Sequence, residues 1–211
     1  MPVLAYIVVA LGAYLLGSIP AGFLVAKAKG IDIRSVGSGN IGATNAMRVL
    51  GKPAGIFVLV MDALKGFASV AWLPILILKI SGVSTIDLET LKILAGIFAV
   101  LGHNYTCWLK FKGGKGVATS AGVFLALAPL AVGIAFTVFI LTVLLTRYVS
   151  VGSIAAAIAL PVAVWFTQEN LFLKIVTIAL GALAIYKHKG NLQRLRAGTE
   201  NRLQFKKKET T

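Results

Sequence analysis

Long apolar runs separated by short polar segments constrain this chain more than any other feature of its sequence. A bilayer core of roughly 30 Å is crossed by about 20 helical residues, and only helices or closed barrels satisfy their own backbone hydrogen bonds there. Of the 211 residues 58% are hydrophobic and 13% are charged. The apolar runs are Val3–Ala26, Ala54–Leu78, Ile93–Leu109, Val117–Thr146, Val149–Phe166 and Leu171–Tyr186. We therefore expect one all-α integral membrane domain over residues 1–211, with a flexible basic tail at 202–211.

The run Val117–Thr146 decides how many times the chain crosses. As one straight helix it would be about 45 Å long, which is more than one crossing needs. A break near Pro129 would give two crossings, of which Val117–Ala128 is short and is expected to be tilted or only partly inserted. The sequence therefore predicts seven transmembrane helices.

The distribution of basic residues indicates how these helices are oriented. With the N-terminus outside and seven crossings, all but four of the 21 lysines and arginines fall on the cytoplasmic side, as the positive-inside rule requires. This topology also places the C-terminus in the cytoplasm and the longer polar loops on one face. The net charge of +14 is thus explained by anionic lipid, and a nucleic-acid partner is not expected.

Three of the polar segments share an unusual composition. They are Ser35–Arg48 (SVGSGNIGATNAMR), Lys110–Thr119 (KFKGGKGVAT) and Lys187–Asn201 (KHKGNLQRLRAGTEN). Glycine lets backbone N–H groups approach an anion closely, and lysine and arginine supply the opposite charge. Three such segments on one face predict a shared anion site at the membrane surface.

The first segment combines glycines with hydrogen-bonding side chains ahead of Arg48, whose guanidinium can grip a phosphate or carboxylate with two parallel hydrogen bonds. A soluble loop could contain this mixture for turn formation alone, but polar groups between two spans need partners or a water-lined cavity. The candidate binding residues here are Ser38, Gly39, Asn40, Gly42, Thr44 and Asn45.

The second segment places a glycine-rich loop before a helix expected to begin near Val117. Such a loop offers N–H donors and the positive end of a helix dipole, which suits a phosphate. It lacks the spacing of a Walker A motif, and a basic turn at the membrane surface is the alternative interpretation. The candidates are Lys112, Gly113, Gly114, Lys115 and Gly116.

The third segment contributes His188 and Asn191, which would share one face of a helix. Histidine is the side chain best suited to accept a proton near neutral pH, although His103 competes for that role. Glu200 is expected to pair with Arg194 or Arg196 in this basic tail.

Asp62 and Lys65 are two ionised residues three positions apart inside an apolar run. That spacing lets them neutralise each other on a surface that faces other helices. A structural ion pair and a functional site both remain open.

The order GSGNIGATNAMR, GHNY…FKGGKGVAT and HKGNLQRLRAGTEN resembles the three signature motifs of the bacterial acyl-phosphate:glycerol-3-phosphate acyltransferases (PlsY type) over the whole chain. The resemblance implies a seven-span inner-membrane enzyme, with its site facing the cytoplasm, that moves an acyl chain from acyl phosphate to the 1-hydroxyl of glycerol 3-phosphate. The products are lysophosphatidic acid and phosphate, in phospholipid biosynthesis. Functional coupling to the enzyme that makes acyl phosphate is a further expectation. Thr106 departs from the pattern, since proline is common there, and only a local change of chain direction is expected.

Carried over motif by motif, the resemblance implies catalytic roles for Ser38, Arg48, Lys112, His188 and Asn191, and a structural role for Glu200. An acyl phosphate is already activated, so no cofactor is expected, and two histidines, one cysteine and few acids suggest no metal site. Either His188 or an oxygen of the acyl phosphate could accept the hydroxyl proton, and the sequence leaves both open.

Two other functions compete with this one. A transporter of a phosphorylated metabolite would also use glycine-broken helices and a basic lining. An acyltransferase that uses acyl-CoA or acyl carrier protein would be expected to carry an HxxxxD motif. Neither His103 nor His188 has an aspartate five residues later.

Overall fold

The computed structural model describes residues 2–82 and 86–203, and all regular structure in these ranges is helical. The elements are α1 (Pro2–Ser18), α2 (Ala21–Lys27), α3 (Ala43–Leu50), α4 (Lys52–Ala71), α5 (Leu73–Ser81), α6 (Leu88–Asn104), the 3₁₀ turn η1 (Cys107–Leu109), α7 (Val117–Leu127), α8 (Pro129–Thr146), α9 (Val149–Thr167), α10 (Leu171–Lys187) and α11 (Lys189–Arg196). The predicted all-α class is confirmed. Of the tail expected to be flexible, 204–211 lies outside the described residues.

Among the residues that the structure describes, four helical segments are long and apolar enough to cross a membrane, namely Val3–Lys27, Lys52–Ser81, Pro129–Thr146 and Val149–Thr167. Helices α10 and α11 form a fifth candidate that is bent by 50°. Large apolar side chains cover the outside of the bundle; Leu145 is 85% exposed and Phe166 is 83% exposed. Because so much exposed apolar surface suits lipid rather than water, the chain is an integral membrane protein.

Prolines mark the points at which the apolar runs change direction. The predicted break in the fourth run is confirmed, since α7 ends before Ala128 and Pro129 begins α8. The first two runs are also divided, which the sequence reading did not anticipate: Pro20 separates α1 from α2, and Trp72 separates α4 from α5, which carries Pro74 in its first turn. Proline lacks an N–H group and is best accommodated in the first turn of a helix, although α9 continues through Pro161.

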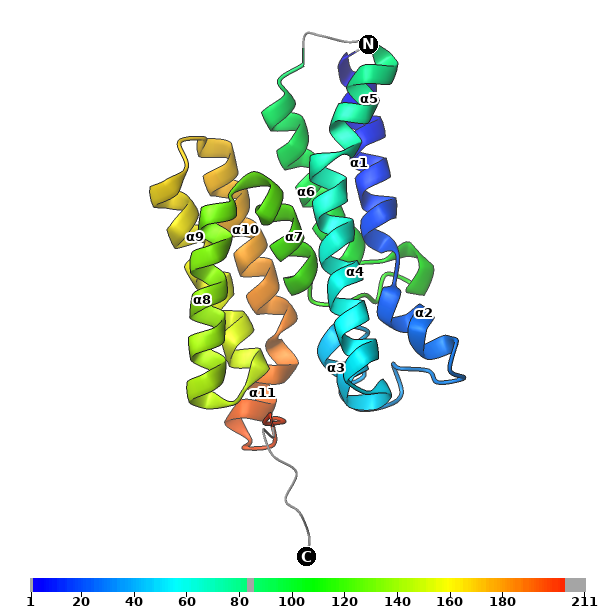
Figure 1. Ribbon diagram of the computed structural model, residues 1–211, viewed down its shortest axis with the longest axis vertical. Coiled ribbons are helices and arrows are strands. Elements are labelled where there is room, and N and C mark those ends of the chain that lie inside the picture. The colour runs from blue at the N-terminus through cyan, green and yellow to red at the C-terminus, as the bar shows by residue number, and fades with distance from the viewer. Residues whose placement is uncertain (1, 83–85, 204–211) are drawn as a thin grey trace, which may run out of the picture.

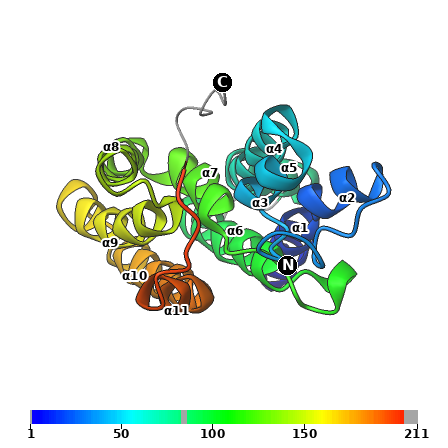
Figure 2. The same ribbon diagram turned by 90° about the horizontal axis from the view of Figure 1, so that it is seen from below.

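Helices α6 and α7 lie in the middle of the bundle, between α1, α4 and α5 on one side and α8, α9 and α10 on the other (Figures 1 and 2). Glycines allow close contacts between these helices. A Cβ atom at Gly122 would lie 1.9 Å from the carbonyl oxygen of Ala63, and one at Gly17 would lie 2.1 Å from that of Ala99. Backbones meet there without intervening side chains, as is common in membrane bundles.

The polar segments gather at one end of the bundle. Helices α2, α3 and α11 lie at the end opposite the N-terminus (Figure 1). Beneath α2 and α3, a small apolar core that includes Ala26, Ile33 and Ala46 fixes the loop that carries the first segment. The fold therefore holds the candidate residues on ordered backbone.

Candidate functional site

A pocket of about 160 Å³ brings the three polar segments together. Its lining residues are Ser38, Gly39 and Asn40 from the first segment, Lys115 from the second, and Lys187, Gly190, Asn191 and Arg194 from the third. Lining residues more than 70 positions apart in the chain thus share one cavity. The predicted convergence of the three segments is confirmed by this geometry.

Positive charge dominates the pocket. Lys115, Lys187 and Arg194 all line it, and Glu200 is the carboxylate in contact with this group. Burial lowers the pKa of Lys115 to about 8; Glu200 opposes this shift, and the positive charges of Arg194 and Arg48 add to it. Because these three cations outnumber the carboxylate of Glu200, the charge around the pocket is positive and complementary to an anion.

Asn45 organises the loop of the first segment. Its side chain is 1% exposed, and its Nδ2 donates to the carbonyl oxygens of Ile33, Val36 and Asn40 at 2.9–3.3 Å. Its Oδ1 accepts the N–H of Ser38 at 2.8 Å. The amide is therefore occupied by the protein, and Asn45 holds Ser38 and Asn40 at the pocket.

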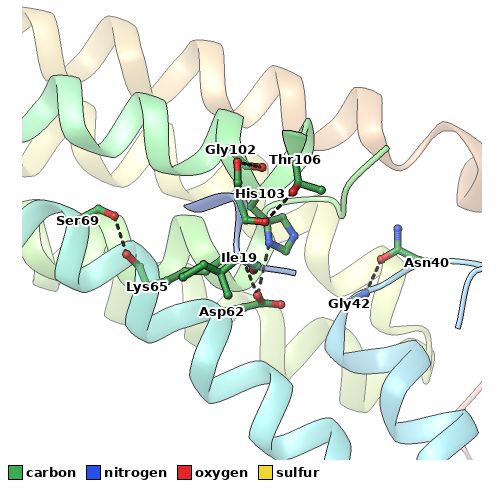
Figure 3. A network of polar contacts seen from close by, with 10 residues as sticks. Ile19, Asn40, Gly42, Asp62, Lys65, Ser69, Gly102, His103 and Thr106 are labelled. Carbon is green, nitrogen blue, oxygen red and sulfur yellow. Dashed lines mark hydrogen bonds and ion pairs between the residues drawn. The ribbon is translucent and has the colours of Figure 1, made fainter. Parts of the chain in front are cut away.

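The same loop also holds Gly42, the residue at the N-terminal cap of α3. The Asn40 side chain accepts the N–H of Gly42 at 2.9 Å, immediately before α3 begins (Figure 3). Arg48 and Thr44 extend from this helix as exposed side chains, and neither lines the pocket. The charge of Arg48 is nevertheless close enough to lower the pKa of Lys115.

The glycines of the second segment pack against the end of α6. The N–H of Gly114 donates to the carbonyl oxygen of His103 at 3.0 Å, and that of Gly113 donates to Asn104 at 3.3 Å. These two N–H groups, expected to face a phosphate, are therefore used within the protein. Gly116 caps α7 at φ +81°, a conformation that favours glycine.

A hydrogen-bonded chain connects the second and third segments. The Lys115 ammonium donates to Asn191 Oδ1 at 2.5 Å, and Asn191 Nδ2 donates to Glu200 Oε1 at 2.7 Å. Glu200 also accepts from Ser150 and from Arg194 Nε, each at 2.8 Å. The predicted Glu200–Arg194 pair is confirmed, and these hydrogen bonds hold the pKa of Glu200 below its usual value against the effect of burial. Glu200 thereby orients two side chains of the pocket.

His188 is the N-cap residue of α11, the helix that carries Asn191, and its carbonyl oxygen accepts the N–H of Asn191 at 2.9 Å. It lies in the bend between α10 and α11, and its Nδ1 lies 2.7 Å from the carbonyl oxygen of Ala184. The side chain is 2% exposed and does not line the pocket. Burial, assisted by the charge of Lys115, lowers the pKa of His188 to about 4, so the ring is neutral at pH 7.

Some candidate residues lie around the pocket rather than in its lining. They are Gly42, Thr44, Asn45, Arg48, Lys112, Gly113, Gly114, Gly116 and His188. Conversely, Lys187, Gly190 and Arg194 line the pocket but were not among the candidates. Their location in the basic third segment was the available signal, and the bend of 50° that follows Lys187 has no clear mark in the sequence.

Comparisons with known proteins identify the family of this chain. Residues 7–198 match the family described as glycerol-3-phosphate acyltransferase. Proteins of that name from Geotalea daltonii and Geobacter metallireducens are 48% and 53% identical, over 92% and 90% of this chain and 96% and 94% of theirs.

Two crystal structures of PlsY (YgiH), an integral membrane glycerol 3-phosphate acyltransferase, share the fold. The glycerol 3-phosphate form has a TM-score of 0.84 and 40% identity and covers 94% of this chain and 96% of its own. The lysophosphatidic acid form has a TM-score of 0.81 and 39% identity, with 94% and 95% covered. The chain belongs to the glycerol-3-phosphate acyltransferase family.

Proposed function

We propose that this protein transfers an acyl chain from acyl phosphate to the 1-hydroxyl of glycerol 3-phosphate, giving lysophosphatidic acid and inorganic phosphate. The observation that carries the proposal is the cationic pocket in which all three polar segments meet. Both substrates carry a phosphate, so the site must hold two anions close together against their mutual repulsion. The charges of Lys115, Lys187 and Arg194 meet that need.

The reaction requires positioning more than activation. The oxygen of the 1-hydroxyl attacks the acyl carbon, the bond from that carbon to the phosphate oxygen breaks, and phosphate leaves. Because the donor is a mixed anhydride, no covalent enzyme intermediate is needed, and alignment of the two substrates lowers the barrier. Fixed cations around the pocket stabilise the negative charge that develops on the carbonyl oxygen and the departing phosphate.

The proposed roles follow the position of each residue. Lys115 and Asn191 contact substrate directly in the pocket, with Ser38, Gly39 and Asn40 facing them. Arg48 offers a phosphate the two parallel N–H donors of its guanidinium from outside the pocket lining, and Lys112 lies exposed at the start of the glycine loop. The remaining candidates, Gly42, Thr44, Asn45, Gly113, Gly114 and Gly116, shape the two loops that hold the phosphates.

For the proton of the attacking hydroxyl, we favour an oxygen of the acyl phosphate as acceptor over His188. The imidazole is buried, lies outside the pocket lining and has a pKa lowered to about 4, which makes it a weak base. Single-turnover acyl transfer by His188→Gln tests this. Near-normal chemistry at saturating substrate is expected, and a loss of more than about a thousandfold would identify the histidine as the base.

The topology and location of the protein are part of the same proposal. Seven crossings, formed by α1 with α2, α4 with α5, α6, α7, α8, α9 and α10, would place the N-terminus outside and the pocket on the cytoplasmic face of the bacterial inner membrane. Single cysteines at Ser38 and Glu169, introduced into a Cys107→Ser background, test the arrangement. An impermeant thiol reagent applied to intact cells should label position 169 and spare position 38.

A turnover assay separates this function from its alternatives. Purified protein in detergent should release phosphate and form lysophosphatidic acid from acyl phosphate and glycerol 3-phosphate. Acyl-CoA or acylated acyl carrier protein, supplied as the donor instead of acyl phosphate, should give no product. Uptake of glycerol 3-phosphate into vesicles without turnover would instead identify a transporter. Because a free anhydride is exposed to hydrolysis, we also infer functional coupling to the enzyme that makes acyl phosphate.

A further inference from the structure

A buried polar network lies behind the pocket and takes no part in the proposed reaction. It consists of Asp62 and Lys65 on α4 and His103 near the end of α6, with side chains that are at most 6% exposed (Figure 3). Lys65 Nζ and His103 Nδ1 lie 2.8 Å and 3.5 Å from Asp62 Oδ1. The predicted Asp62–Lys65 ion pair is thus confirmed, and a histidine joins it.

The lysine also stabilises the break between α1 and α2. Its ammonium donates to the carbonyl oxygen of Ile19 at 2.7 Å, next to Pro20, and that oxygen also accepts the N–H of Ala21 at 3.1 Å. Nearby, the hydroxyl of Thr106 donates to the carbonyl oxygen of Ser18 at 2.6 Å. Thr106 has φ −64°, which a proline would also adopt. The network therefore fixes α4, α6 and the α1–α2 break relative to one another.

His103 is the member of this network that touches the glycine loop. A Cβ atom at Gly114 would lie 2.1 Å from His103 Nε2, and the next two nearest atoms also belong to the imidazole ring. The carbonyl oxygen of His103 accepts the N–H of Gly114, and a Cβ atom at Gly113 would lie 2.0 Å from that oxygen. The loop therefore rests directly on His103.

We propose that His103, held in place by Asp62, is a positioning residue for Lys115. Gly114 lies against the imidazole ring, and the next residue, Lys115, enters the pocket and donates to Asn191. If the ring shifted, Gly114 and the ammonium that follows it would shift as well. Gly114 is then a glycine because the ring occupies the space of a side chain, and not because a phosphate approaches its backbone.

A double-mutant cycle distinguishes these two explanations. Gly114→Ala alone should lose activity because its methyl group displaces the ring, and His103→Ala alone should lose activity because the loop loses its support. In the double variant the methyl group fits the vacated space. Its activity should exceed the product of the two single losses by about tenfold, a coupling typical of residues in contact. If a phosphate required the bare backbone, the two losses would simply multiply.

A neighbouring glycine provides the matched control. Gly116→Ala also perturbs the loop, but its Cβ atom would meet the Asn104 side chain at 2.7 Å rather than His103. Replacing His103 with alanine should not rescue Gly116→Ala. Equal rescue at both positions would show general relaxation of the loop and would overturn the proposal.

A positioning role also predicts which kinetic constant changes. His103→Ala should alter the same constant, KM or kcat, that Lys115→Met alters, and Asp62→Asn should do so to a smaller extent. A purely structural defect would lower kcat by reducing the active fraction while KM stayed constant. If Gly114→Ala fails to fold, recovery of a monodisperse, thermally stable protein in the double variant reports the same contact.

These experiments rest on the proposed function, because they measure acyl transfer. Turnover by the wild-type protein separates the proposed function from the positioning role of His103. Absence of turnover by the wild type would contradict the proposed function. Wild-type turnover combined with strictly multiplicative losses at His103 and Gly114 would contradict only the positioning role.

Discussion

The ammonium of Lys115 should give the enzyme an alkaline limit. Burial lowers its pKa to about 8, so the free enzyme loses this positive charge as pH rises through that value. If the charge attracts a substrate phosphate, kcat/KM should fall about tenfold per pH unit above pH 8, since this ratio reports ionisation of the free enzyme. A bound phosphate favours the charged amine, so kcat should persist to higher pH.

The assay is the rate of phosphate release between pH 6 and pH 9.5, with Lys115→Arg as the control. A guanidinium stays charged throughout this range, so the arginine variant should keep whatever activity it has without the alkaline fall. Folding stability should change in the opposite direction. The unfolded chain binds a proton at Lys115 between pH 8 and about 10.4 that the folded chain lacks, so stability rises there. A flat wild-type profile to pH 9.5, or the same fall in Lys115→Arg, would refute the reasoning.

Three further predictions concern other contacts. Glu200→Ala should lower the free energy of unfolding by about 2–4 kcal/mol, because three hydrogen bonds to a carboxylate are lost while Arg194 is partly solvated. Since the pKa of Glu200 is lowered in the fold, the wild type should lose this stability on acidification and the variant should not. Arg48→Lys should lose most acyl transfer at unchanged charge, and unchanged kinetics would show that the guanidinium fork is not used. Gly122→Ala should destabilise by about 1–3 kcal/mol or more through contact with α4, while Gly133→Ala, with open space around it, should not; equal melting temperatures would contradict this.

The sequence could predict features that depend on local chemistry. Pro129 identified the division between α7 and α8, and i, i+3 spacing identified the Asp62–Lys65 pair. The basic tail indicated an arginine partner for Glu200 but left Arg194 and Arg196 open, and the structure has Arg194. Each of these follows from backbone covalent geometry or from charges a few residues apart.

Features that depend on the packing of distant helices could not be predicted. Lys187 at the end of α10 and Arg194 on α11 line one pocket across a bend of 50° between the two helices. Asn45 was expected to bind substrate, but the turn before α3 encloses its amide with backbone groups of its own loop. The contact of His103 with Gly114 requires α6 to end beside a loop whose own fold is set by the 3₁₀ turn between them.

The bend between α10 and α11 has a consequence for how the enzyme samples its substrates. It turns the chain from an apolar helix to a polar one at the residues that line the pocket, so the proposed topology would place the site where hydrocarbon meets water. Glycerol 3-phosphate then arrives by diffusion in three dimensions, whereas the acyl donor arrives by diffusion in the plane of the bilayer. The effective concentration of the acyl donor is its mole fraction among the lipids. Additional membrane therefore dilutes the acyl donor and leaves the concentration of glycerol 3-phosphate unchanged.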